Sequence, residues 1–157
     1  MLLEGRVPAL VGPILFGGAL TAISKKGGGV RPITVGYVWR RLTGKVACRR
    51  VSEEAAILLG PRQLGFGVAG GCEASVHLVR RFVENWPPGH VLLKIDFKNA
   101  FNTVRRDVIL EAVAKHFPSL LQFTTSCYGQ TSELGFGGFT ISSEEGAQQG
   151  AQQGVTH

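Results

Sequence analysis

Residues 91–97, with the sequence VLLKIDF, constrain the fold more than any other part of the chain. This apolar run follows a Pro-Pro-Gly turn and is too short for a typical helix, so it predicts a buried β-strand. Asp96 lies at its end, where a carboxylate costs desolvation free energy unless it is paired, hydrogen-bonded or bound to metal. Asp96 is therefore a candidate functional residue. The alternative is an ion pair with Lys94, Lys98 or Arg105, or a role in capping a turn.

Helical and strand patterns are mixed along the rest of the chain. Apolar residues at helical spacing predict one helix starting at Val38 and another over residues 74–86. A third is expected after Thr103, which would cap its start, and Pro118 would end it. A further helix is expected over residues 119–128. Residues 133–146 predict a β-hairpin whose outgoing strand is FTIS. Because strands and helices do not alternate regularly, the expected fold class is α+β.

The helix starting at Val38 carries two stripes. Val38, Leu42 and Val46 recur at helical spacing and predict a buried face. Basic residues recur beside them and predict a positive face. Eight of the 17 basic residues lie between Lys25 and Arg50 with no acidic residue among them: Lys25, Lys26, Arg31, Arg40, Arg41, Lys45, Arg49 and Arg50. This local positive field and the net charge of +6 favour an anionic partner, with a solvated surface as the alternative.

The cysteines and the N-terminal apolar segment bear on the compartment. Cys48, Cys72 and Cys127 are odd in number and far apart, which predicts three thiols of the core in a reducing compartment. Residues 7–23 are apolar, but prolines and glycines interrupt them and they are shorter than a usual membrane span. The first residues lack the basic excess of a signal peptide. We expect an intracellular chain without a membrane partner.

Four blocks resemble the reverse transcriptases (RNA-directed DNA polymerases) of non-LTR, LINE-type retrotransposons. Residues 94–107, KIDFKNAFNTVRRD, resemble the first catalytic motif of that family. Residues 25–46 resemble its fingers segment, residues 63–80 the block that follows, and residues 142–150 the start of its Gln-Gly motif. The resemblance implies a partial polymerase right-hand fold. The fingers would cover about residues 1–90, and an incomplete palm about residues 91–157.

The same resemblance assigns the chemistry to the first motif. Asp96, with the backbone carbonyl of Phe97, would bind Mg²⁺ or Mn²⁺. Magnesium prefers carboxylate and phosphate oxygens, and a pair of such ions can clamp the attacking and leaving oxygens of a phosphoryl displacement. Phe101 would lie under the sugar of the nucleotide and exclude a 2′-hydroxyl, unless it is simply a core residue.

Nucleotide binding would involve two further blocks. Arg31, assisted by Lys25 or Lys26, would grip the triphosphate, because a planar guanidinium can meet phosphate oxygens in pairs. Gln149 and Gly150 match the pair that packs near the nucleotide and template. The repeat GAQQ makes Gln153 and Gly154 rival candidates.

The partners implied by the family are an RNA template, a DNA primer and deoxynucleoside triphosphates, and the compartment implied is the nucleus. The residues expected to hold nucleic acid are Arg40, Arg41, Lys45, Arg49 and Arg50.

The chain departs from the family in ways that bear on activity. It has no Asp-Asp pair, which active members carry downstream, and Gly150 leads into Ala151 rather than the usual Asp-Pro-Leu-Gly. We therefore expect little or no polymerase activity from this chain. An RNA-binding fragment without catalysis and a decayed transposon remnant are alternatives. A remoter one is a dinucleotide-binding turn at Gly65, Gly67 and Gly70, which requires a strand leading into the first glycine.

Overall fold

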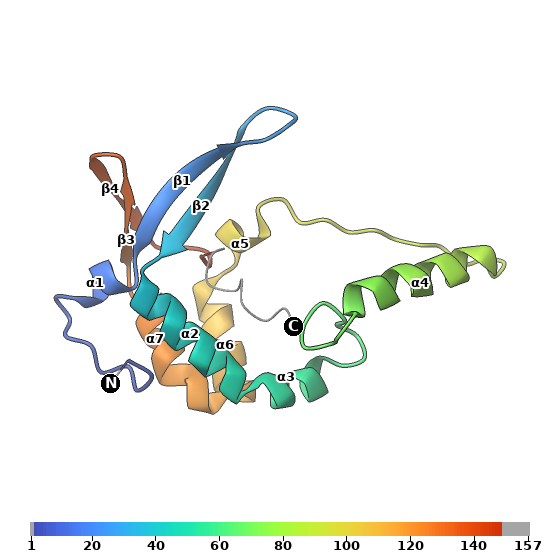
Figure 1. The fold of residues 1–157 in the computed structure, drawn as a ribbon, viewed down its shortest axis with the longest axis horizontal. Helices are drawn as coiled ribbons and strands as arrows, with labels where there is room; N and C mark the ends of the chain where they lie inside the picture. Colours follow the sequence, from blue (N-terminus) through green and yellow to red (C-terminus); the bar gives the residue numbers. More distant parts are fainter. Residues whose placement is uncertain (1, 149–157) are drawn as a thin grey trace. The chain divides into compact units, whose positions relative to one another are not determined.

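The structure is a computed structural model that describes residues 2–148 (Figure 1). The chain forms two compact units. The first combines residues 2–49 with residues 99–148, and the second is residues 50–98. Helices and a mixed sheet occur together, as expected for an α+β fold. The polymerase right hand, with its division into fingers and palm, stays a prediction.

A four-stranded sheet in the order β2-β1-β3-β4 forms the first unit's framework (Figure 1). Its strands are β1 (Gly18–Ser24), β2 (Val30–Gly36), β3 (Ser132–Phe136) and β4 (Phe139–Ser143). β1 and β2 form an antiparallel hairpin, and so do β3 and β4. A short parallel pairing between β1 and β3 joins the two hairpins. The sheet therefore brings together segments separated by about a hundred residues.

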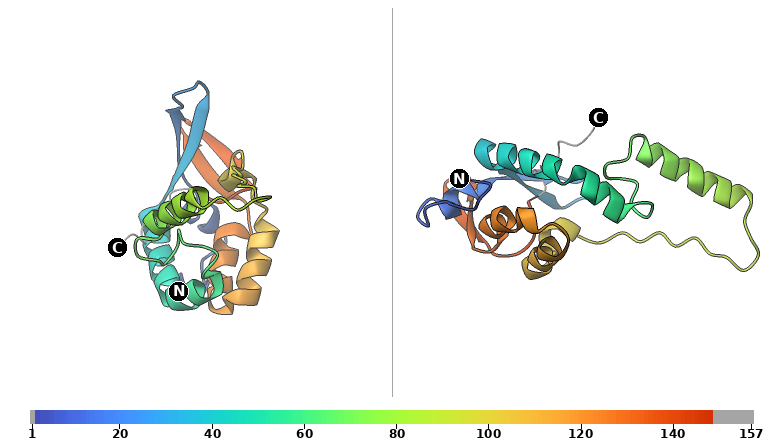
Figure 2. Two further views of the ribbon diagram at one scale, coloured as in Figure 1. Left: turned by 90° about the vertical axis from the view of Figure 1, so that its right-hand side faces the viewer. Right: turned by 90° about the horizontal axis from the view of Figure 1, so that it is seen from below.

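Helices pack beside this sheet in the first unit (Figure 2). They are α1 (Gly12–Leu15), α2 (Val38–Arg50), α5 (Ala100–Thr103), α6 (Arg106–His116), the 3₁₀ helix η1 (Pro118–Leu120) and α7 (Leu121–Tyr128). Phe16 lies in the core with Ala47 from α2 and with Phe123 and Cys127 from α7. The helices thus contact one another through small and aromatic side chains of the core.

The second unit contains α3 (Ser52–Leu59) and α4 (Gly71–Glu84). Residues 60–70 between them form turns and coil, and contain no strand. The dinucleotide-binding alternative required a strand leading into Gly65, so the structure contradicts it. Within residues 2–148, no helix is long and apolar enough to cross a membrane.

Most of the expected elements are confirmed. The helices predicted from Val38, over 74–86, before Pro118 and over 119–128 correspond to α2, α4, α6 and α7. The predicted hairpin corresponds to β3 and β4.

The buried strand predicted over residues 91–97 is wrong. These residues have no regular secondary structure, and their apolar side chains are exposed, from Leu92 at 52% to Val91 at 85%. A strand is stable only when a neighbour satisfies its backbone hydrogen bonds. Among the described residues, no strand pairs with this segment. Its hydrophobic pattern alone therefore did not determine its conformation.

Three side-chain predictions also differ from the structure. Thr103 does not cap α6, because it ends α5 and its hydroxyl donates to the carbonyl of Asn99. Two of the three cysteines expected in the core, Cys48 and Cys72, are exposed, and Cys127 alone of the three is buried.

The buried face of α2 differs as well. Val38, Leu42 and Val46 are exposed, whereas Arg40 and Ala47 are buried. Arg40 can be buried because a backbone carbonyl accepts from its guanidinium and an aromatic ring lies beside it. These partners are far away in sequence, so the periodicity of α2 does not reveal them.

Candidate functional site

An open cavity of about 500 Å³ lies on the first unit, against one face of the sheet. It is lined by Leu20 on β1, Pro32 and Thr34 on β2, Leu134 on β3, Asn102 on α5, and residues 142–148. Leu20 and Thr34 are direct partners in the β1–β2 register. The cavity therefore has the sheet as its floor, with α5 and the chain after β4 as walls.

Two backbone hydrogen bonds hold the chain after β4 against α5. The amide of Ala147 donates to the carbonyl of Phe101 at 2.7 Å, and that of Gly146 donates to the carbonyl of Val104 at 3.2 Å. Gly146 has a φ of +73°, and a Cβ there would lie 2.7 Å from the carbonyl oxygen of Asn102. Glycine is required at this position, because the conformation is left-handed and the contact leaves no room.

The carbonyl of Phe16 accepts hydrogen bonds from two buried side chains. Nε2 of Gln148 donates to it at 3.1 Å, and the guanidinium of Arg40 also donates to it. Arg40 is 4% exposed and Gln148 7% exposed. Oε1 of Gln148 has no hydrogen-bond partner among the described residues. The end of the cavity wall is thus anchored to the start of β1 and to α2.

Arg106 makes the most extensive side-chain contacts with the cavity wall. Its guanidinium donates to the carbonyl of Gly146 at 3.0 Å, to the carbonyl and the hydroxyl of Ser143 at 2.9 Å each, and to the carbonyl of Glu145 at 3.1 Å. A longer bond of 3.4 Å reaches the carbonyl of Gln130. Burial lowers the pKa of Arg106 from its ordinary value.

Tyr128 lies beside the buried Arg40 and the partly buried Arg106. The guanidinium carbon of Arg40 is 5.3 Å from the centroid of the Tyr128 ring, and that of Arg106 is 5.7 Å from it. Both distances fall within the range of cation–π attraction. The ring therefore contacts arginines from two other helices and joins α2, α6 and α7.

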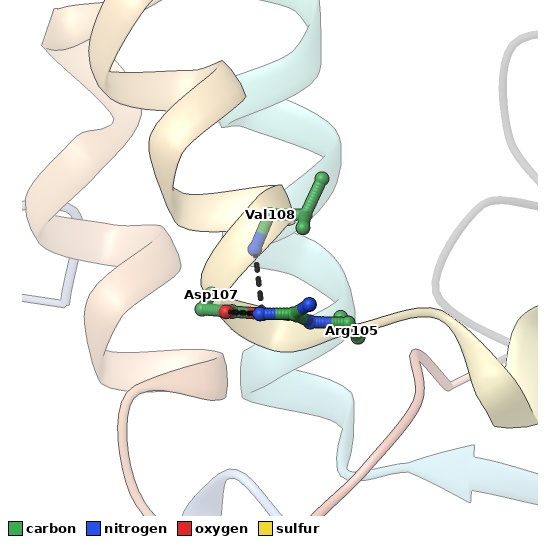
Figure 3. Close-up of polar contacts among 3 residues, drawn as sticks. All are labelled: Arg105, Asp107 and Val108. Atoms are coloured by element: carbon green, nitrogen blue, oxygen red, sulfur yellow. Dashed lines mark hydrogen bonds and ion pairs between the residues drawn. The ribbon is translucent and has the colours of Figure 1, made fainter.

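The neighbouring Arg105 has a different environment (Figure 3). It forms an exposed ion pair with Asp107, whose Oδ1 also accepts from the amide of Val108 at 2.9 Å. The hydrogen bond from Arg105, followed by that from the Val108 amide, lowers the pKa of Asp107. This cluster lies at the start of α6, where a negative charge is favourable to the helix dipole.

The structure places the residues predicted to bind nucleotide at different distances from the cavity. Phe101 is half-exposed, and its carbonyl joins α5 to the cavity wall. Lys25, Lys26 and Arg31 are exposed near the tip of the β1–β2 hairpin. Arg31 lies between Val30 and Pro32, so strand alternation directs it to the face opposite the cavity. Gln149, Gly150 and their rivals Gln153 and Gly154 lie outside the described residues.

Asp96 and Phe97 belong to the second unit, in the exposed segment 91–97. No group of three or more His, Cys, Asp or Glu residues that could hold a metal ion occurs within residues 2–148. A magnesium ion requires several oxygen ligands, and Asp96 with the Phe97 carbonyl would supply only part of them. Metal binding by these two residues stays a prediction from the family resemblance.

The predicted nucleic-acid-binding residues are divided between surface and interior. Lys45, Arg49 and Arg50 are exposed on α2, and Arg41 is partly exposed. Arg40 is buried and bonded to the Phe16 carbonyl, so it is not presented to solvent with the others. It supports the fold around the cavity instead.

Comparison with known proteins adds a relationship by sequence. The chain is similar to a protein of a retrotransposable element. It is 32% identical over 128 residues to the 132 kDa protein of the retrotransposable element SLACS from Trypanosoma brucei gambiense. The alignment covers 80% of this chain and 10% of that protein, so the chain spans about a tenth of its length. No family model matches the chain.

Arg106 and Gln148 were not among the residues selected from the sequence. Arg106 stands beside Arg105 at the start of a helix, and no periodicity distinguishes the partly buried arginine from the exposed one. Two of the blocks that resemble the family nevertheless contain these residues. Arg106 lies within residues 94–107, and Gln148 precedes Gln149.

Proposed function

We propose that this chain is part of the RNA-directed DNA polymerase of a non-LTR retrotransposon, and that the cavity of the first unit binds the incoming deoxynucleoside triphosphate. The relationship to a retrotransposon protein supports the broader assignment. The specific assignment of the cavity rests on one observation. Parts of three separate blocks that resemble reverse transcriptases line it: β2, α5 and the chain after β4.

The charges around the cavity suggest the orientation of the nucleotide. Glu144 and Glu145 line the wall, and their carboxylates disfavour a triphosphate beside them. The nucleoside therefore occupies the cavity, where Thr34, Asn102 and Ser143 offer hydrogen-bonding groups. The triphosphate extends toward the tip of the hairpin, which carries Lys25 and Lys26. No catalytic step is assigned.

Filling the cavity tests this proposal. Leu20 faces the cavity, whereas the adjacent Thr21 faces the other side of the same strand. We expect Leu20→Trp to weaken binding of a fluorescent deoxynucleoside triphosphate at least about tenfold, the loss of about 1.4 kcal/mol. Thr21→Trp is the matched control and retains the affinity of the unmodified chain. Equal affinities in the two variants would exclude this cavity as the site.

A second candidate function is RNA binding by the exposed cations of α2. Lys45 and Arg49 lie on its exposed face, and the exposed Trp39 offers a ring on which a base can stack. Such binding falls steeply with salt and does not depend on the cavity. Lys45→Gln with Arg49→Gln would then reduce RNA affinity and the slope against salt, while Leu20→Trp would leave both unchanged.

A further inference from the structure

The wall of the cavity formed by residues 143–146 has few apolar contacts to hold it. Ser143, Glu144 and Glu145 are polar or charged, and the segment follows the edge strand β4. Its position therefore depends mainly on hydrogen bonds. The bonds that reach it from outside are the β-sheet pairing of Ser143 with Ser132 of β3, the bond of the Gly146 amide to the Val104 carbonyl, and those from one side chain, that of Arg106.

The geometry of Arg106 is specific to a guanidinium. Three different nitrogen atoms donate, and they reach the carbonyls of Ser143, Glu145 and Gly146 as well as the hydroxyl of Ser143. A lysine has a single ammonium group and cannot span acceptors on several successive residues. The Tyr128 ring beside it also limits the positions of the guanidinium. The arginine is thus itself held in place while it holds the wall.

We propose that Arg106 is a positioning residue that fixes residues 143–146 as one wall of the cavity and so sets the cavity's affinity for a deoxynucleoside triphosphate. This inference rests on the proposed function for the identity of the ligand. Arg106 itself is not required to touch the nucleotide. Its effect is transmitted through the bonded carbonyls and the adjacent amides of Gly146 and Ala147, which contact α5.

The experiment combines a local structural measurement with a binding measurement. Hydrogen exchange of the Gly146 and Ala147 amides is followed by NMR in the unmodified chain, in Arg106→Lys and in Arg105→Lys. The affinity for a fluorescent deoxynucleoside triphosphate is measured at a temperature well below the unfolding midpoint of each variant. Arg105 is the matched control, because it is adjacent, exposed and bonded to Asp107 rather than to the wall.

We expect Arg106→Lys to accelerate exchange of both amides about tenfold or more, as expected for the loss of hydrogen bonds to a charged group. The dissociation constant rises by a similar factor, whereas Arg105→Lys changes neither quantity. A purely structural role would lower the unfolding midpoint without changing the affinity of the folded protein. If Arg106→Lys does not fold, Ser143→Ala removes one of the same bonds and shifts both quantities in the same direction by a smaller factor.

The outcomes separate this inference from the function on which it rests. Unchanged exchange in both Arg106→Lys and Ser143→Ala overturns the positioning role. Faster exchange with unchanged nucleotide affinity also overturns it, because the wall would then not set the affinity. If the unmodified chain binds no nucleotide, the proposed function fails, and with it the ligand named here.

Discussion

Replacing Gly146 with alanine tests the architecture of the cavity wall. Gly146 has a φ of +73°, and an added Cβ would lie 2.7 Å from the backbone oxygen of Asn102. A left-handed conformation costs a residue with a Cβ about 1–2 kcal/mol. Overpacking against backbone adds about 1–3 kcal/mol. We therefore expect Gly146→Ala to lower the free energy of unfolding by about 2–5 kcal/mol, a large fraction of the stability of a typical domain.

Gly138→Ala provides the matched control in the same part of the chain. Its added Cβ would meet nothing within 4 Å, and its φ does not lie in the left-handed region. We expect a change below about 1 kcal/mol, and a stabilising one if the backbone accommodates alanine without strain. Urea unfolding followed by circular dichroism measures both variants. If Gly146→Ala were as stable as Gly138→Ala, the chain after β4 would not lie against α5, and the cavity described here would not exist.

Further predictions concern ionisable groups. Burial raises the pKa of the Cys127 thiol to about 11 and also raises that of Cys48, so an aromatic disulfide reagent at pH 8 should modify the exposed Cys72 first, Cys48 more slowly and Cys127 only on unfolding. The Cys127 thiol ionises at a lower pH in the unfolded chain than in the folded one, so the free energy of unfolding should fall as the pH rises toward 11. Cys127→Ala should reduce this fall, which urea unfolding at alkaline pH measures. The pKa of the Asp107 carboxyl is lowered, and an NMR titration of the unmodified chain should place it below the ordinary range. Arg105→Gln should raise that pKa, because it removes the hydrogen bond and the charge of Arg105.

The sequence was most informative where local patterns decide the structure. The helix that ends before Pro118 and the hairpin of β3 and β4 follow from turn residues and periodicity. It was least informative where distant partners decide. Arg40 is buried in place of Val38 because Phe16 and Tyr128 supply its contacts, and neither lies near it in sequence. For residues 91–97, hydrophobicity predicted a strand, but a strand also requires a neighbour to pair with.

The candidate site could be predicted in part. The family resemblance selected the segments that contain Phe101 and Gln149. In the structure, the segment with Phe101 and the residues just before Gln149 lie at one cavity. The resemblance did not select Arg106, because the carbonyls that its side chain binds belong to a segment about forty residues away in the sequence. Backbone acceptors leave no pattern in the sequence of the residues that provide them.

NMR mapping would show where on the chain a deoxynucleoside triphosphate binds. Backbone amide shifts of the isotope-labelled chain are followed as a deoxynucleoside triphosphate is added. Binding in the cavity predicts saturable shifts at Leu20, Thr34, Asn102 and residues 142–148, which line it. Saturable shifts confined to other residues, or none at all at millimolar nucleotide, would contradict it.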